Sequence, residues 1–360
     1  MKLLFTYFIP SGGIETLNRL RYHALRAVGI ESHALYLWNG AGTQNMADIP
    51  HFVTNNDFEI IDVLKSGSYD AVIVICDHLM LQRIRGLGYK GPVLYEAQGL
   101  GTREDAIGTI AFASTFIRAY AQGVVSPPTS HMMELFQHYL GDFPRFYVQN
   151  MIDTQQFSHH AAPWLNPAGA PILGWIGRLE HNKNWRLYLR ILAALAANRP
   201  DLTGWIFEDA FIAGPGEREA FNAMVQELGL QQRLVVRSNM PHSHMPYYLS
   251  AIGDSGGMLL STSYAEGFGY AVAEAMSCRC PVLSTDSDGV RCFIDHNRTG
   301  KFFVSRTVQE AVAEANELLD NRSLAERMRT KAQQHIRTHF SPGRYAADFI
   351  NVLAAIGLHR

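Results

Sequence analysis

The feature that most constrains the fold is a long alternation of apolar runs with helical patterns. Residues 71–75 read Ala-Val-Ile-Val-Ile, five apolar residues in succession, which is typical of a parallel strand buried on both faces. Similar runs recur along the chain, and stretches with apolar residues at helical spacing separate them. This alternation predicts doubly wound α/β domains with parallel sheets. Ligands bind such domains at the carboxyl ends of the strands.

Composition excludes several classes of protein. The 360 residues suffice for two domains of common size, and 47% hydrophobic with 18% charged residues argues against disorder. A net charge of −2 gives no basic footprint for a nucleic-acid partner. The apolar run at residues 3–8 is too short for a signal peptide, and no run reaches membrane-spanning length. We therefore expect a cytoplasmic protein, with membrane association left open but not indicated.

One segment combines a predicted strand, a glycine turn, a helix and a second strand. Glu266-Gly267-Phe268-Gly269 follows the apolar residues 258–260, and Glu274 comes eight residues after Glu266. Glycines allow backbone N–H groups to approach a ligand, and the start of a helix suits phosphate. An ionised carboxylate accepts hydrogen bonds from hydroxyl groups such as those of a ribose. The segment indicates a site for phosphate and hydroxyl groups.

Two basic residues follow another predicted strand, at residues 172–176. Arg178 offers a planar fork of N–H groups and Lys183 a point charge, and together they suit a diphosphate. Taken alone, such a pair is more typical of a solvated helix start. Its position at a strand's carboxyl end, where ligands bind, is what favours a diphosphate site.

These segments resemble the motifs of retaining glycosyltransferase family 4, the group 1 glycosyltransferases of GT-B fold. Glu266 and Glu274 match the family's Glu-x7-Glu signature, and residues 177–183 match its Gly-Arg-Leu…Lys motif. The resemblance implies two Rossmann-like domains that face each other across a cleft, with a C-terminal helix crossing back to the first. We expect an acceptor-binding domain at residues 1–160, a nucleotide-sugar-binding domain at 161–340 and the returning helix at 341–360.

The resemblance also implies roles for individual residues. Arg178, Lys183 and Glu266 are the expected catalytic residues. Many relatives carry a histidine where Gln98 stands, in contact with the transferred sugar. The residues expected to bind the nucleotide-sugar are Gly12, Gly13, Gln98, Ser238, Met240, Gly267, Phe268, Gly269 and Glu274.

The implied activity is transfer of a sugar, with retention of configuration, from a nucleotide-sugar to an acceptor hydroxyl. A UDP-sugar is the first expectation, and the acceptor is a small molecule, a glycan or a lipid-linked molecule. No metal or other cofactor is expected: Asp286 and Asp288 form an Asp-x-Asp, but their place in the chain matches a turn of the family. Two alternatives remain, a nucleotide-sugar epimerase of GT-B fold and a non-catalytic GT-B partner subunit. The presence of Arg178, Lys183, Glu266 and Glu274 together argues against the second.

Other polar and sulfur-containing residues are expected to be structural. Cys278 and Cys280 form a C-x-C, which is not a zinc spacing, so reduced thiols are expected. The pairs His159–His160 and His242–His244 have no carboxylate or thiol at useful spacing and are predicted to be loop surface. His78 follows a buried strand, and contact with the acceptor or a plain strand-end role fits it about equally. Residues 158–171, with three prolines, are predicted to link the domains.

Overall fold

The computed structural model describes residues 1–101 and 103–359, which form two compact units. Unit 1 consists of Met1–Met151 and the chain from Phe340 onward, and unit 2 is Ile152–His339. Each unit is a parallel α/β domain of Rossmann type, as predicted. The division follows residue 151 rather than 160, so residues 158–171 lie within unit 2.

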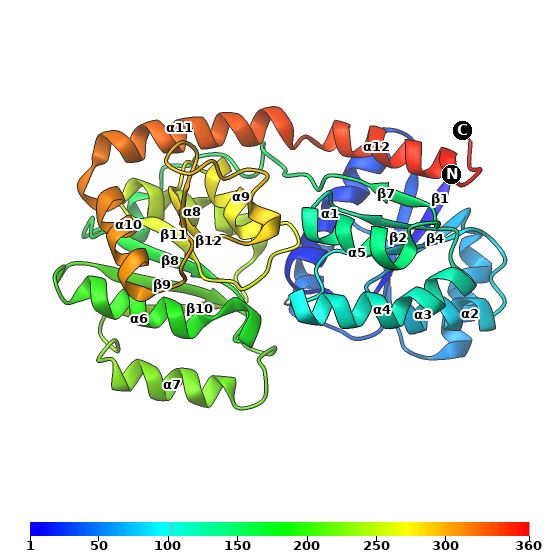
Figure 1. Cartoon of the computed structure of the whole chain (residues 1–360), viewed down its shortest axis with the longest axis horizontal. Helices are drawn as coiled ribbons and strands as arrows, with labels where there is room; N and C mark the ends of the chain where they lie inside the picture. The colour runs from blue at the N-terminus through cyan, green and yellow to red at the C-terminus, as the bar shows by residue number, and fades with distance from the viewer. Residues whose placement is uncertain (102, 360) are drawn as a thin grey trace. The chain divides into compact units, whose positions relative to one another are not determined.

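Unit 1 is built on a seven-stranded sheet of order β3-β2-β1-β4-β5-β6-β7 (Figure 1). Every neighbouring pair is parallel. Its strands are β1 (Lys2–Tyr7), β2 (Glu31–Tyr36), β3 (His51–Val53), β4 (Ala71–Ile75), β5 (Val93–Glu96), β6 (Gly123–Ser126) and β7 (Arg145–Tyr147). Its α-helices are α1 (Gly12–Ala27), α2 (Asp57–Gly67), α3 (His78–Gly86), α4 (Arg103–Tyr120), α5 (Ser130–Leu140) and α12 (Pro342–Ala355).

Helices cover both faces of this sheet. Side chains of α2, α3, α4 and α5 share one apolar core with one face of β1, β4 and β5. The chain's last helix, α12, packs beside α1, and the Phe349 ring lies 5.9 Å from that of Phe5. Ser341 caps α12 by accepting a hydrogen bond from the Arg344 N–H, and Pro342 starts the helix. The C-terminal helix therefore belongs to the first unit's core.

Unit 2 is built on a six-stranded parallel sheet of order β10-β9-β8-β11-β12-β13. Its strands are β8 (Ile172–Ile176), β9 (Thr203–Glu208), β10 (Leu234–Ser238), β11 (Met258–Ser261), β12 (Val282–Thr285) and β13 (Lys301–Phe303). Its α-helices are α6 (Trp185–Ala196), α7 (Glu217–Glu227), α8 (Met245–Asp254), α9 (Tyr270–Ser277), α10 (Val308–Asp320) and α11 (Arg322–His339).

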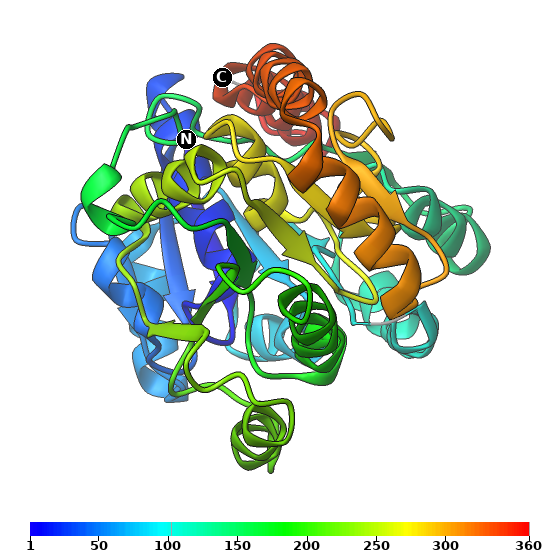
Figure 2. The same cartoon turned by 90° about the vertical axis from the view of Figure 1, so that its left-hand side faces the viewer.

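The helices of unit 2 form a layer on each side of the sheet (Figure 2). Helix α6 contacts α7 and α10 on one side, whereas α9 contacts α8 and α11 on the other. The core on the α6 side is rich in large side chains, among them Trp175, Trp185 and Tyr188, which are all fully buried. Such a rigid two-sided core fixes the loops that follow the strands.

Some elements differ from the sequence-based expectation. The sequence predicts a short helix over residues 114–120, whereas the observed helix α4 already begins at Arg103. Strand β3 and helix α3 were not predicted at all. Strand β3 has three residues and lies at the edge of the sheet, where it pairs with β2, so it carries little periodic signal. Within the described part of the chain, no helix is both long enough and apolar enough to cross a bilayer.

Candidate active site

The candidate site of unit 2 lies where the strand order reverses. Strands β8 and β11 are neighbours, and the chain runs outward from them in opposite directions, to β10 on one side and β13 on the other. Loops at such a switch point diverge and leave a crevice at the carboxyl ends of the strands. Gly177–Lys183 follows β8, and residues 262–269 follow β11.

Lys183 and Glu266 meet at this point. The Lys183 ammonium donates to Glu266 Oε1 at 2.6 Å, and the Ser263 hydroxyl donates to the same oxygen at 2.6 Å. Both charged side chains are largely but not fully covered, with 22% and 14% of their surface exposed. A lysine has three N–H groups, so this pairing leaves two for a ligand.

Asn182 holds the two loops together. Its side-chain amide donates to the Ala265 carbonyl at 3.0 Å and accepts from the Ala265 N–H at 3.1 Å. Its own carbonyl accepts from the Tyr264 N–H at 2.8 Å. These three bonds fix the loop after β8 against the loop after β11. The Lys183–Glu266 pair is therefore held in place by hydrogen bonds to the backbone as well as by its own charge attraction.

Arg178 makes a looser contact. Its guanidinium donates to Glu180 at 3.3 Å, and about a third of each side chain is exposed. An exposed pair of this kind contributes little to stability. Arg178 is therefore free to exchange Glu180 for an anionic ligand at low cost.

The turn after Glu266 depends on two glycines. Gly269 has φ of +85° and directly precedes α9, a conformation that a side chain would strain. A Cβ on Gly289 would lie 2.4 Å from the Glu266 carbonyl oxygen, whose own partner is the Gly289 N–H at 2.9 Å. Phe268 is buried and packs against the Phe293 ring at 5.4 Å. The segment 288–293 thus packs against the Glu266 turn and stabilises it through the Gly289 hydrogen bond and the Phe268–Phe293 contact.

Glu274 has a partner that the sequence did not reveal. His242 Nε2 lies 2.9 Å from Glu274 Oε1, and both side chains are mostly buried. The Phe157 ring lies 4.7 Å from the imidazole and restricts it further. The prediction of loop surface for His242 is therefore wrong, because the fold brings together two residues 32 positions apart.

A second buried carboxylate, that of Glu208, lies at the carboxyl end of β9, next to the end of β10. The Ser238 hydroxyl donates to Glu208, and Arg218 donates to the other oxygen of Glu208 at 2.5 Å. Met240 is half-buried and follows Asn239, whose φ is +52°. The hydroxyl of Ser238 is thus engaged within the protein, while its backbone and that of Met240 line the end of the strand.

The three remaining predicted residues lie in unit 1. Gly12 and Gly13 are exposed at the start of α1, and Gly12 has φ of +66°. Their N–H groups belong to the first turn of the helix, where intrahelical partners are missing. This leaves a backbone site that suits an anion.

Gln98 lies just beyond β5, and its amide has partners within the unit. It donates to Glu96 and accepts from the Asn150 side-chain amide at 2.7 Å. Glu96 also receives two bonds from Arg21, at 2.6 and 2.8 Å, and this pair is fully buried. Gln98 is therefore part of a buried polar network, a feature that its place in the sequence did not indicate.

The structure also shows the surroundings of the histidines and cysteines that were predicted to be structural. His159 Nε2 lies 2.9 Å from Asp254, and about a third of the His159 side chain is exposed, so the loop-surface prediction is confirmed for this residue. Burial raises the pKa of the Cys280 thiol to about 12, so this thiol stays protonated and unreactive. Among residues 1–101 and 103–359, no three His, Cys, Asp or Glu side chains are arranged to hold a metal ion.

The chain is similar to several known proteins. Residues 157–335 match the family model of glycosyl transferases group 1. The 2-deoxystreptamine N-acetyl-D-glucosaminyltransferase of Streptomyces fradiae is 31% identical over 125 residues, which cover 35% of this chain and 28% of that protein. Across two such curated relatives, the chain spans only 28% and 53% of the relative's length.

Two solved structures resemble the whole chain. HepE of Anabaena, in complex with UDP-glucose, has a TM-score of 0.85 at 17% identity, with 99% of this chain and 100% of that chain covered. Sucrose-phosphate synthase of Thermosynechococcus elongatus has a TM-score of 0.79 at 16% identity, with 99% of each chain covered. At this level of identity the likeness concerns the fold.

Proposed function

Because the chain belongs to the group 1 glycosyl transferases through residues 157–335, we propose that it transfers a sugar from a nucleotide-sugar donor to an acceptor hydroxyl. The observation that carries the proposal is the Lys183–Glu266 pair at the switch point of the second sheet. A cation and a carboxylate in contact, beside a glycine turn, suit a ligand that has both phosphate and hydroxyl groups.

The proposed donor site uses each group for the chemistry it can perform. Lys183 and Arg178 neutralise the diphosphate, and the N–H groups of residues 267–269 at the start of α9 add donors. Glu266 accepts hydrogen bonds from the sugar hydroxyls. Glu274 accepts from the ribose, while His242 fixes the orientation of that carboxylate.

The reaction proceeds with retention of the anomeric configuration. The bond between the anomeric carbon and the diphosphate oxygen breaks, and the acceptor oxygen forms its bond to the same face of the sugar. The diphosphate leaves with the bonding electrons and takes the acceptor proton. Lys183 and Arg178 act most strongly in this transition state, because the negative charge on the diphosphate grows as the bond breaks.

The proposed reaction needs no metal ion. Asp286, the first carboxylate of the Asp-x-Asp, receives two hydrogen bonds from Arg291, at 2.7 and 3.0 Å. Asp288 accepts a third from the same guanidinium at 3.4 Å. The Arg291 guanidinium thus contacts both carboxylates, and it would compete with a metal cation for them.

A screen of nucleotide-sugars tests the proposal. UDP-sugars are the first choice, since HepE, which shares the fold, was solved with UDP-glucose. A ligand at 100 times its dissociation constant stabilises a protein by about 2.7 kcal/mol, which a thermal shift detects readily. We expect a shift with one nucleotide-sugar class and a smaller shift in Glu274→Ala, which removes the proposed ribose partner. A screen of UDP-, GDP-, ADP- and TDP-sugars in which none shifts the melting temperature would refute the proposal.

Product analysis separates transfer from the alternative of epimerisation. A transferase releases nucleoside diphosphate only as an acceptor is glycosylated, whereas an epimerase changes the sugar without an acceptor. NMR of the anomeric proton in the product then reports whether the configuration is retained. Inverted product would leave the transferase proposal standing and remove the retaining mechanism.

A further inference from the structure

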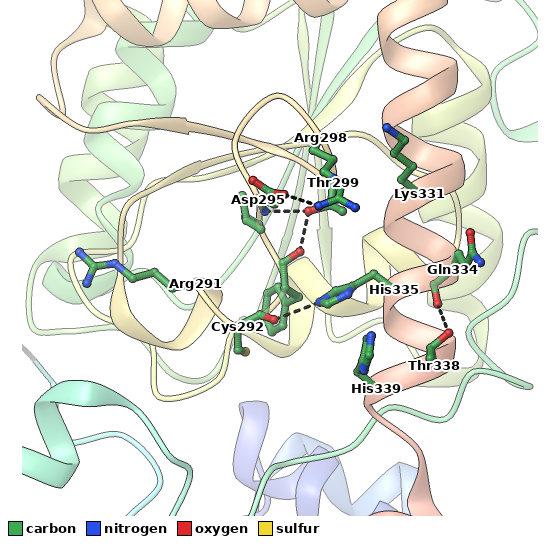
Figure 3. A pocket seen from close by; sticks show the side chains of 12 residues that line it. Arg291, Cys292, Asp295, Arg298, Thr299, Lys331, Gln334, His335, Thr338 and His339 are labelled. Carbon is green, nitrogen blue, oxygen red and sulfur yellow. Dashed lines mark hydrogen bonds and ion pairs between the residues drawn. The ribbon is translucent and has the colours of Figure 1, made fainter.

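A second pocket lies in unit 2, between the segment 291–299 and the C-terminal half of α11 (Figure 3). Its volume is about 470 Å³. None of the residues that line it is among the predicted catalytic or donor-binding residues, although Phe293 also packs against Phe268. Nothing in the proposed reaction uses this pocket, so its chemistry has to be considered separately.

The two walls of the pocket are fixed by hydrogen bonds. His335 on α11 lies with Nε2 3.1 Å from the Cys292 carbonyl, and this contact ties the helix to the segment. The Thr299 hydroxyl donates to the Phe293 carbonyl at 2.8 Å and accepts from the Asp295 N–H at 2.7 Å. The cavity is therefore a built feature of the unit and does not depend on a loose loop.

The charges around the pocket are mainly positive. Arg298 from the segment and Lys331 from α11 flank the same end of the pocket (Figure 3). Lys331 has no carboxylate partner among residues 1–101 and 103–359. Arg298 is paired with Asp295 at 3.2 Å, but both side chains are more than half exposed, and such pairs are weak. Among the described residues that line the pocket, Asp295 carries the only carboxylate.

We propose that this pocket binds a small molecule that carries a phosphate group. Lys331 and Arg298 supply the two cations, and the His339 ring lies farther along the same helix face. Arginine and lysine are the side chains that proteins use to hold phosphate. The volume lies within the range of about 300–1,000 Å³ that is usual for small-molecule sites.

Calorimetry with inorganic pyrophosphate tests the proposal on the full chain. Saturating UDP is present, so that the diphosphate position of the proposed donor site is filled. We expect pyrophosphate to bind the wild type and the double variant Arg298→Gln/Lys331→Gln to bind it at least about tenfold more weakly. Both substituted side chains are exposed or partly exposed, so the melting temperature should not change.

A matched control removes two positive charges elsewhere on the same helix. Arg322 and Arg337 lie on α11 but outside the lining of the pocket. The variant Arg322→Gln/Arg337→Gln should bind pyrophosphate like the wild type. Absence of pyrophosphate binding in the wild type, or equal weakening in the two double variants, would overturn the proposal.

The outcome is independent of the proposed function. If UDP does not bind, the proposed donor site is in doubt, and the titration is repeated without UDP in a Lys183→Ala background. Pyrophosphate binding that still depends on Arg298 and Lys331 there would support the pocket by itself. Loss of that dependence would refute it.

Discussion

Lys183 is the residue whose removal should cost most in turnover. It contacts Glu266 and retains two N–H groups for a diphosphate. We expect Lys183→Ala and Arg178→Ala each to lower kcat about a hundredfold, or about 3 kcal/mol, because both cations act on charge that develops in the transition state. Arg190→Ala, at an exposed position of α6, is the matched control. Steady-state kinetics in which only the donor KM rises would contradict the assigned role.

The two glutamates should separate in their effect on nucleotide binding. Glu274→Ala should weaken binding of free UDP by about 1.5–3 kcal/mol, the usual cost of losing hydrogen bonds to a charged group. Glu266→Ala should leave free UDP almost unaffected, because its proposed partner is the sugar. Calorimetry with UDP alone measures both, and equal losses would show that the roles are misassigned.

His242 should affect UDP binding indirectly, through its contact with Glu274. We expect His242→Ala to weaken UDP binding less than Glu274→Ala does, because the carboxylate remains but loses its fixed orientation. His242→Gln keeps an N–H donor and should recover part of the loss. His244→Ala, an exposed neighbour on the same 3₁₀ turn, is the control. If His242→Ala binds UDP like His244→Ala, the contact with Glu274 has no part in nucleotide binding.

Gln98 should affect stability even without a ligand. Gln98→Ala removes one bond to the buried Glu96 and one from Asn150, which should lower the free energy of unfolding by about 1.5–3 kcal/mol. Urea unfolding of the ligand-free protein measures this. Unchanged stability together with relaxed choice among nucleotide-sugars would instead favour the sugar contact that the family resemblance implies.

The sequence reveals site residues that belong to a local motif, but it does not reveal which distant residues contact them. Lys183 and Glu266 each sit in a recognisable strand–loop pattern, so their meeting at the sheet edge could be anticipated. His242, the partner of Glu274, and Asn150, one partner of Gln98, lie 32 and 52 positions away, with no spacing signal. Only the folded sheet brings such pairs together.

At the scale of elements, α12 is the clearest test of the fold. Phe349 is fully buried and packs against Phe5 and Tyr345. We expect Phe349→Ala to destabilise unit 1 by about 3–5 kcal/mol, measured by urea unfolding. Asn351→Ala, on the exposed face of the same helix, is the control. Equal stability of the two variants would mean that α12 is not part of the core.

Elements made of consecutive buried residues were predictable, whereas edge strands and helices with largely exposed turns were not. The buried strand at residues 71–75 was placed at its observed bounds because all five of its residues are buried. Helix α4 was predicted too short, since exposed residues dominate its first two turns and leave a weak apolar stripe.

For the whole molecule, we expect catalysis to survive removal of divalent metal ions. Arg291 occupies the Asp286 and Asp288 carboxylates that a metal would need. Turnover measured with excess EDTA should equal that of the untreated protein. Loss of activity that Mn²⁺ or Mg²⁺ restores would assign these carboxylates to a metal, and Asp286→Asn should then abolish the rescue.

The two doubly wound α/β domains followed from the alternation of strands and helices, but the division between the units did not. Residues 158–171 have the proline content of a linker, yet His159 and His160 hold this segment to α8 within unit 2. Composition alone cannot distinguish an irregular segment that packs on a domain from one that connects two domains.

The discontinuity of unit 1 has a consequence for protein synthesis. Domains form as the chain emerges from the ribosome, N-terminal part first. All of Ile152–His339 is made before α12. All residues of unit 2 have therefore been synthesised before Phe349 and Tyr345 exist. Until then, Phe5 lacks its contact with Phe349, and the buried Arg21 lacks its contact with Tyr345. The domain whose translation begins first is the last to complete its core.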